Sequence, residues 1–125
     1  MPGSLEDEAA LRAAVAGVDV VVHLAALTHA RSAEEYAAAN VAGTRRLLEA
    51  ARRAGVRRLV YLSSLAASGP AIEGRGVTAA DPARPLTEYG RSKLAGERVL
   101  MEEAGDIDVV ILRAPAVYGP RDTDL

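Results

Sequence analysis

Val18-Asp19-Val20-Val21-Val22-His23-Leu24 is a nearly continuous apolar run that is rich in β-branched residues. Such a run is typical of a strand that is buried on both faces of a parallel sheet. Two similar runs follow, Arg58-Leu59-Val60-Tyr61-Leu62-Ser63-Ser64 and residues 107–113. We therefore expect three strands, and we expect the first of them to be buried on both faces.

Helical patterns separate these strands. Residues 5–16 have Ser4 as a candidate N-cap and acidic side chains in the first turn, and Gly17 ends the segment. Residues 32–54 form a long alanine-rich helical pattern, and residues 87–104 return to helix. Helices that alternate with strands through short links predict right-handed crossovers and a doubly wound α/β sheet.

Composition limits the classes of function. A chain of 125 residues with 50% hydrophobic residues and a net charge of -2 is one soluble globular domain or a piece of one. It has no basic field for nucleic acid, and without cysteine and with two histidines we expect no metal site. The longest apolar run, residues 18–27, is too short to cross a bilayer, and the acidic N-terminus has no signal core. We expect no membrane contact and a cytoplasmic location.

Lys93 is the single lysine among fifteen cationic side chains, and it lies four residues after Tyr89 in Tyr89-Gly90-Arg91-Ser92-Lys93. Positions i and i+4 share one face of a helix, so a phenol and an ammonium can reach one small volume. An ammonium can sit beside a phenol and donate to a ribose hydroxyl, which suits a tyrosine acid/base near neutral pH. Taken alone, the pair is equally consistent with two solvated side chains.

In doubly wound sheets a ligand binds at the carboxyl ends of the strands. Residues 24–26 leave the first strand, Ser63-Ser64 ends the second and Pro115 follows the third. The helix that carries Tyr89 begins just after residues 65–85, a loop rich in proline and glycine that is long enough to be functional. The residues capable of chemistry therefore converge on one edge of the predicted sheet.

Several short motifs follow one another in a specific order and spacing. They are Val21-Val22-His23-Leu24-Ala25-Ala26, Asn40-Val41-Ala42-Gly43-Thr44, Leu47-Leu48-Glu49-Ala50-Ala51, Tyr61-Leu62-Ser63-Ser64, Tyr89-Gly90-Arg91-Ser92-Lys93, and Leu112-Arg113 with Tyr118-Gly119-Pro120. With these motifs nearly the whole chain resembles the central part of an extended short-chain dehydrogenase/reductase of the NAD-dependent epimerase/dehydratase family. The resemblance implies a partial doubly wound, Rossmann-like parallel sheet.

The resemblance also implies where the chain departs from the family. The glycine-rich phosphate turn belongs to a first βαβ unit that would precede Gly3, and the substrate region would follow residue 125. We therefore expect residues 1–125 to be the central part of an NAD(P)-binding Rossmann domain, truncated at both ends. A sheet without its first strands exposes an apolar edge and lacks the helix N-terminus that binds pyrophosphate. We expect the chain alone to bind dinucleotide weakly or not at all.

Three catalytic residues follow from the resemblance. Ser64 would hold the substrate oxygen, Tyr89 would be the general acid/base, and Lys93 would bind the nicotinamide ribose and lower the pKa of Tyr89. Bringing a phenol from about 10 to near 7 requires roughly 4 kcal/mol. A close cation at an effective dielectric constant near 20 supplies about that order of energy.

The implied cofactor is NAD or NADP. Leu24, Ala25 and Ala26 would line the path of the adenosine ribose and the pyrophosphate, because small side chains let the backbone approach closely. Ser4 and Leu5 match the family's Gly-Asp-Leu region that contacts adenine, although Ser4 stands where aspartate is usual.

The nicotinamide end involves other residues by the same resemblance. Asn40 would lie under the active site, and Pro115 and Val117 would pack near the nicotinamide, where Tyr89 and Lys93 also bind. The implied partner is a small-molecule substrate, and the complete protein can be a homodimer.

The substrate class stays open at this point. Ala116 stands where family members that act on nucleotide sugars often carry asparagine. The segment Ser64-Leu65-Ala66-Ala67-Ser68-Gly69-Pro70 also resembles the branch near the 3β-hydroxysteroid dehydrogenase/isomerase proteins. A sugar nucleotide and a hydrophobic hydroxy or keto compound are both compatible with the sequence.

Two other classes of function are also open. One is a noncatalytic module that binds dinucleotide, and the other is an inactive fragment of an enzyme that folds only with a partner chain. An intact set of Ser64, Tyr89 and Lys93 favours the enzyme, because a binding module does not need all three. We interpret His23 as a packing or hydrogen-bonding residue and Tyr61 as a core or surface residue.

Overall fold

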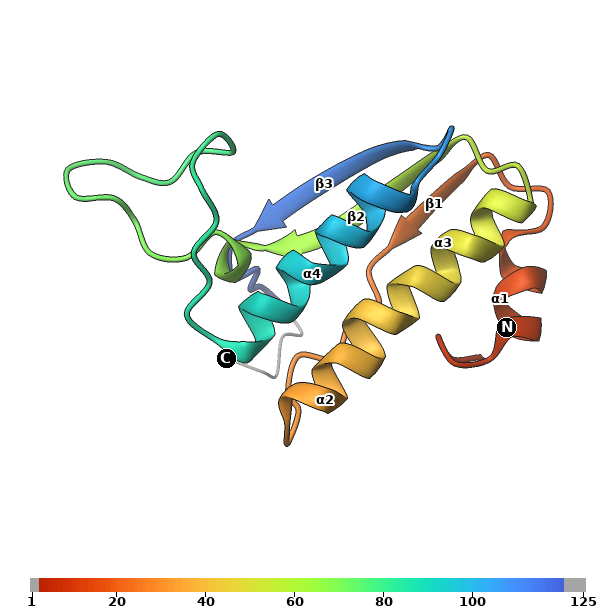
Figure 1. Cartoon of the computed structure of the whole chain (residues 1–125), viewed down its shortest axis with the longest axis horizontal. Helices are drawn as coiled ribbons and strands as arrows, with labels where there is room; N and C mark the ends of the chain where they lie inside the picture. Colours follow the sequence, from red (N-terminus) through yellow and green to blue (C-terminus); the bar gives the residue numbers. More distant parts are fainter. Residues whose placement is uncertain (1–2, 121–125) are drawn as a thin grey trace.

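Three parallel strands form the sheet, β1 (Val20–His23), β2 (Arg58–Ser64) and β3 (Asp108–Ala114), in the order β1-β2-β3. This is a computed structural model that describes residues 3–120. β2 is central, since its first residue pairs with the first residues of both neighbouring strands. The α/β class and the parallel sheet predicted from the sequence are confirmed (Figure 1).

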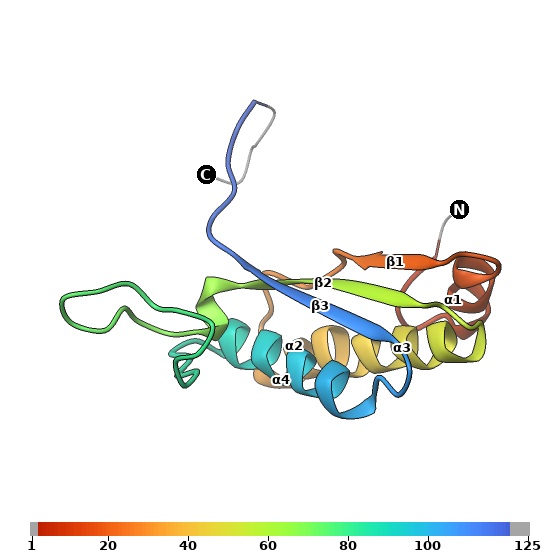
Figure 2. The same ribbon diagram turned by 90° about the horizontal axis from the view of Figure 1, so that it is seen from above.

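The helices that follow β1 and β2 lie on one face of this sheet (Figure 2). α2 (Ala33–Tyr36) and the π-helical turn η1 (Ala37–Ala42) lead without a break into α3 (Gly43–Arg53), and α4 (Glu88–Glu103) lies beside α3. α1 (Glu8–Val15) packs against α3. Because each strand is added on the same side of its predecessor, crossovers of one hand place their helices on a single face.

This one-sided cover explains a correction to the sequence prediction. Alternate side chains of a strand point to opposite faces. On the face that the helices leave bare, Val20 is 50% exposed and Val22 is 58% exposed. On the covered face, Leu59 and Tyr61 of β2 are at most 1% exposed. The prediction that the first strand is buried on both faces is therefore wrong for the described residues.

The first helix begins later than the sequence predicts. Asp7, rather than Ser4, is its N-cap, and the Asp7 carboxylate accepts a hydrogen bond of 3.0 Å from the Ala10 N–H. The Ser4 hydroxyl instead accepts from the Glu6 N–H at 3.2 Å in the turn before the helix. A carboxylate at the N-cap also complements the positive end of the helix dipole, which favours Asp7 over the hydroxyl of Ser4.

The apolar core fills the space between the helices and the covered face of the sheet. Its fully buried side chains include Leu48, Ala51, Leu59, Tyr61 and Leu100. α4 can cross β2 closely because residue 96 is glycine, since a Cβ there would lie 2.6 Å from the Tyr61 hydroxyl. Among the helices described in residues 3–120, we find none that is both long enough and apolar enough to span a bilayer.

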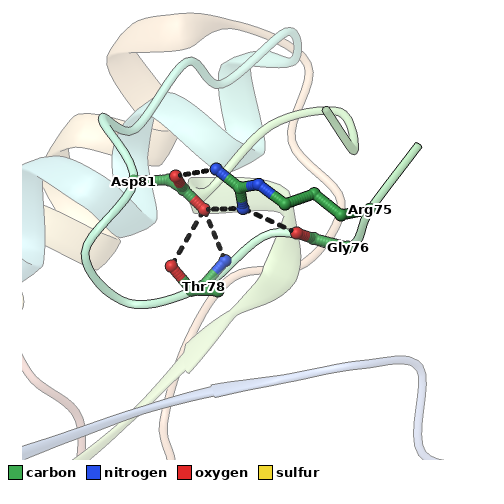
Figure 3. A network of polar contacts seen from close by, with 4 residues as sticks. All are labelled: Arg75, Gly76, Thr78 and Asp81. Carbon is green, nitrogen blue, oxygen red and sulfur yellow. Dashed lines mark hydrogen bonds and ion pairs between the residues drawn. The ribbon is translucent and has the colours of Figure 1, made fainter. Parts of the chain in front are cut away.

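The long loop after β2 begins with a 3₁₀ turn, η2 (Leu65–Ala67), and then extends away from the helices and the sheet (Figure 1). Asp81 holds the loop together (Figure 3). Its carboxylate accepts two hydrogen bonds from the Arg75 guanidinium, at 2.6 and 2.8 Å, and two from the N–H and hydroxyl of Thr78. The bonds from Arg75, followed by those from Thr78, hold the pKa of Asp81 well below its usual range.

Candidate functional site

The C-terminal end of β2 meets the first turn of α4. Ser64 is the last residue of β2 and caps η2, with its hydroxyl accepting from the Ala66 N–H at 3.1 Å. Tyr89 lies in the first turn of α4. Gly90 allows this turn to pack tightly on η2, because a Cβ at residue 90 would lie 2.3 Å from the Ala66 carbonyl oxygen. This close packing brings the side chains of Ser64 and Tyr89 together.

The Tyr89 phenol is half-buried, and its ring packs against Tyr36 with 6.0 Å between the ring centroids. Burial raises the pKa of Tyr89, and the nearby Ser64 side chain lowers it by hydrogen bonding without cancelling the effect of burial. Without a cofactor, desolvation of the phenol outweighs the stabilisation of its charged form. The lowering of the Tyr89 pKa by Lys93 beside a bound nicotinamide stays a prediction.

Lys93 is 2% exposed, one helical turn beyond Tyr89. Its Nζ lies 4.2 Å from the centroid of the Tyr61 ring, which is a cation–π contact. Burial lowers the pKa of Lys93 from 10.5 to about 8, while the charge of Glu97 acts in the opposite direction. Lys93 is therefore mostly protonated at neutral pH, in contact with a ring that the sequence alone did not assign to the site.

Asn40, inside η1, joins the loop after β1 to α4. Its Oδ1 accepts from the Leu27 N–H at 2.7 Å, and its Nδ2 donates to the Leu27 carbonyl at 2.9 Å and to the Ser92 hydroxyl at 3.0 Å. The Thr44 hydroxyl donates to the Asn40 carbonyl at 2.7 Å. The buried Asn40 side chain thus fixes the loop that carries the predicted cofactor residues next to the helix that carries Lys93.

His23 continues this polar layer to β1. Its Nε2 lies 2.9 Å from the Thr44 hydroxyl, and its ring packs on Tyr61 with 5.3 Å between centroids. Burial, and then the charge of Lys93, lower the pKa of His23 to about 4. His23 is therefore neutral at physiological pH and acts as a packing and hydrogen-bonding residue, as we interpreted it from the sequence.

A second buried polar cluster lies beside the first, and it was not predicted from the sequence. The Glu97 carboxylate accepts from the Ser63 hydroxyl at 2.5 Å and from Arg113 Nε and Nη2 at 2.9 and 2.7 Å. Arg113 also donates to the Ser68 hydroxyl at 3.1 Å. One signal in the sequence could have indicated Glu97, because it follows Lys93 by four residues and so shares its face of α4. The register that sets Ser63 opposite Arg113 is known only from the structure.

Three of the predicted cofactor-binding residues lie together in a pocket beside α1. A pocket of about 260 Å³ lies between the segment before α1, α1 itself and the loop after β1. It is lined by Gly3, Ser4, Leu5, Ala10, Leu11, Ala14 and Ala25. The structure therefore brings Ser4, Leu5 and Ala25 together, while Leu24 is 61% exposed and Ala26 is half-buried beside them in the chain.

Pro115 and Val117 are not brought to Tyr89 and Lys93. The segment after β3 rises from the sheet on the side away from α3 and α4 (Figure 2). Both side chains are exposed, and Val117 is 77% exposed. Their role near a nicotinamide therefore stays a prediction.

Known proteins share the sequence pattern and the fold of this chain. The sequence model of the NAD dependent epimerase/dehydratase family matches residues 1–125. The chain belongs to this family. The resemblance inferred from the motifs is confirmed over the whole sequence.

Proteins that are similar to this chain differ in the activity that their names state. Sterol demethylase protein B of Methylococcus capsulatus is 39% identical, with 96% of this chain and 38% of that protein covered. A short-chain dehydrogenase/reductase superfamily protein from Agrobacterium tumefaciens, solved with bound NAD, is 42% identical with a TM-score of 0.77, covering 89% of this chain and 35% of that one.

MoeE5, solved in complex with UDP-glucuronic acid and NAD, is 35% identical with a TM-score of 0.87. The alignment covers 100% of this chain and 44% of MoeE5. The chain thus spans less than half of the length of each of these relatives.

Proposed function

We propose that this chain forms the central part of an NAD(P)-dependent oxidoreductase or epimerase in which Ser64, Tyr89 and Lys93 carry acid/base chemistry. One observation carries the proposal. The close packing at Gly90 sets the Tyr89 phenol beside the Ser64 side chain at the C-terminal end of β2, and the single lysine is buried one turn further along α4. A module that only binds dinucleotide has no use for this combination.

The roles follow from the state of each side chain. The raised pKa keeps the proton on Tyr89 at neutral pH, so Tyr89 begins as a general acid toward a substrate carbonyl oxygen. The Ser64 hydroxyl holds the same oxygen. The Lys93 ammonium donates to a ribose hydroxyl of the cofactor and remains protonated near neutral pH. The nicotinamide, when bound, supplies the redox chemistry.

The residues present fit a dinucleotide in part. Ser4, Leu5 and Ala25 line the 260 Å³ pocket and form the adenine end in this proposal. Leu24 and Ala26 follow the path of the ribose and pyrophosphate, while Asn40 holds their loop against α4. Pro115 and Val117 complete the nicotinamide end. The A. tumefaciens protein and MoeE5 were both solved with NAD, which supports NAD as the first cofactor to test and leaves NADP as the alternative.

Two substrate classes remain candidates. MoeE5 was solved with UDP-glucuronic acid, which supports a sugar nucleotide. Ala116 stands where asparagine is often found in relatives that act on nucleotide sugars, and one similar protein is named for sterol demethylation. These observations support a hydrophobic hydroxy or keto substrate. Turnover assays with both classes separate the candidates.

The test is a chimera in which residues 1–125 replace the matching segment of MoeE5, which the alignment covers without loss of this chain. We expect the folded chimera to bind NAD by calorimetry and to consume UDP-glucuronic acid. Removal of a general acid costs roughly 10²–10⁴-fold in rate, so Tyr89→Phe abolishes measurable turnover while NAD binding is kept. Tyr118→Phe, a change at an exposed tyrosine, is the matched control.

The outcomes separate the alternatives. A folded chimera that binds NAD and keeps its turnover after Tyr89→Phe contradicts the assigned role of Tyr89. Binding without any turnover, with both substrate classes supplied, supports the noncatalytic dinucleotide-binding module instead. Lys93→Met should weaken NAD binding as well as turnover, because the ammonium is assigned to the ribose.

A further inference from the structure

Glu97 is a buried carboxylate with both oxygens engaged. It is 5% exposed and forms an ion pair with Arg113, whose side chain is 21% exposed. The Ser63 hydroxyl donates a third hydrogen bond to it, at 2.5 Å. Arg113 and Ser63 face each other across β3 and β2, so the carboxylate is anchored to two strands at once. Three donors in fixed positions leave Glu97 little freedom to move.

The surroundings of Lys93 contain few other charges. His23 faces it from β1, Tyr61 from β2, and Tyr89 and Glu97 from α4 itself. On α3, Thr44 contributes an uncharged hydroxyl next to His23, and on β3 the charge of Arg113 is paired with Glu97. In the described part of the chain, Glu97 is the one acidic side chain that is buried. It forms an ion pair with Arg113 of β3, and its charge also acts on Lys93 of its own helix.

An ammonium loses its hydration when it is buried, which favours the neutral amine. A fixed anion close to the ammonium opposes this loss, and the opposition is stronger where water is excluded. Glu97 is four residues after Lys93, so the two side chains share one face of α4. Because Ser63 and Arg113 hold the carboxylate from the strand side, it cannot turn away toward solvent.

We propose that Glu97 is a positioning residue that acts through its charge to keep Lys93 protonated beside Tyr61, with Arg113 and Ser63 as its anchors. The inference rests on the proposed function, in which Lys93 must donate to the cofactor as an ammonium. It extends the site from three residues to a linked set that ties α4 to β2 and β3. The pKa of Lys93 agrees with this inference. Burial lowers the pKa to about 8, and the charge of Glu97 acts in the opposite direction.

The single lysine makes a direct test practical. Protein grown with ¹³Cε-labelled lysine gives one side-chain resonance, from Lys93, which can be titrated between pH 6 and pH 11. We expect a midpoint near 8 in the unaltered chain. Glu97→Gln keeps the shape and removes the charge, so we expect the midpoint to fall by on the order of one pH unit or more. At pH 7.5 most Lys93 side chains would then be neutral.

Glu102→Gln is the matched control, because Glu102 is exposed on the same helix, and it should leave the midpoint unchanged. If the amide spectrum shows that Glu97→Gln does not fold, Glu97→Asp keeps the charge but withdraws it by one methylene and should give a smaller fall. An unchanged Lys93 midpoint in a folded Glu97→Gln or Glu97→Asp variant overturns the inference.

This titration needs neither cofactor nor substrate, so its result is independent of the turnover assays. Loss of activity in Lys93→Met together with an unchanged midpoint in Glu97→Gln would overturn the inference about Glu97 alone. Suppose instead that Glu97→Gln shifts the Lys93 midpoint while Tyr89→Phe leaves the turnover of the chimera unchanged. This result would overturn the proposed function and leave the inference about Glu97 intact. An unaltered chain whose lysine titrates near 10.5, together with a folded Glu97→Gln variant that titrates at the same pH, would overturn both the effect of Glu97 and the effect of burial.

Discussion

The two faces of the sheet differ in the kind of side chain they carry. The face under α3 and α4 presents His23, Ser63 and Arg113, which pair with polar groups from the helices, and Tyr61, whose ring contacts the Lys93 ammonium. The bare face presents aliphatic side chains such as Val22. Buried polar groups persist only where partners satisfy them, so the covered face is where the fold can build chemistry. Away from the strand ends, polarity on a strand thus marks the covered face here, whereas Arg58, Ser64 and Asp108 stand at the ends of β2 and β3 on the alternate positions.

The largest expected effect comes from breaking the buried ion pair on the covered face. Arg113→Leu leaves the Glu97 carboxylate buried without its cation, and we expect a loss of about 3–5 kcal/mol in the free energy of unfolding. Arg58→Leu is the matched control, because the Arg58–Asp108 pair is more than half exposed and such pairs contribute within about 1 kcal/mol. Urea unfolding measures both, and equal losses would contradict the contrast.

A second comparison uses one leucine from each face. Leu59 is fully buried in β2, so Leu59→Ala should cost about 2–5 kcal/mol through lost burial and a cavity. Leu112 of β3 is half exposed on the bare face, so Leu112→Ala should cost less than about 1 kcal/mol. The measurement is again urea unfolding of the two variants. A large loss for Leu112→Ala would show that the bare face is covered in solution.

A third comparison concerns the pH dependence of the covered face. The pKa of His23 is lowered from 6.5 to about 4, so between these values the unfolded chain binds a proton that the folded chain does not. The contribution of His23 to stability is therefore fully present above pH 6.5 and falls as the pH drops toward 4, by roughly 3 kcal/mol in total. His23→Gln removes this titration.

Urea unfolding of both proteins between pH 7 and pH 4 gives the comparison as a difference, in which the carboxylates common to both cancel. We expect the unaltered chain to lose stability more steeply than His23→Gln over this range. Parallel curves would mean that His23 is not held neutral by its burial against Tyr61 and its contact with Thr44.

Much of the fold was predictable because the signals are local. The strand at residues 58–64 was predicted residue for residue, and the helix at 87–104 agrees with α4 to within one residue at each end. The burial of both faces of the first strand was predicted wrongly. An apolar run indicates a strand, but it does not indicate whether helices cover one face of that strand or both. The π-helical turn at residues 37–42 was also missed, since nothing in an alanine-rich run indicates the extra residue per turn.

The candidate site was predictable in part for the same reason. Tyr89 and Lys93 belong to one short motif, and Ser64 lies at the strand end where ligands bind in such sheets. Glu97 and Arg113 are sixteen residues apart on different elements, and neither is unusual in an arginine- and glutamate-rich chain. Their pairing becomes visible only when α4 is laid across β2 and β3.

The strand order has a consequence for how the chain acquires its structure. Each strand pairs with the next one along the sequence, and β1 never has to meet β3. Every pairing therefore closes only the segment that separates two consecutive strands, which keeps the entropy of loop closure and the contact order low for a parallel sheet. β1, α3 and β2 can assemble on the ribosome before β3 has been synthesised, and β3 then adds to a template that already exists.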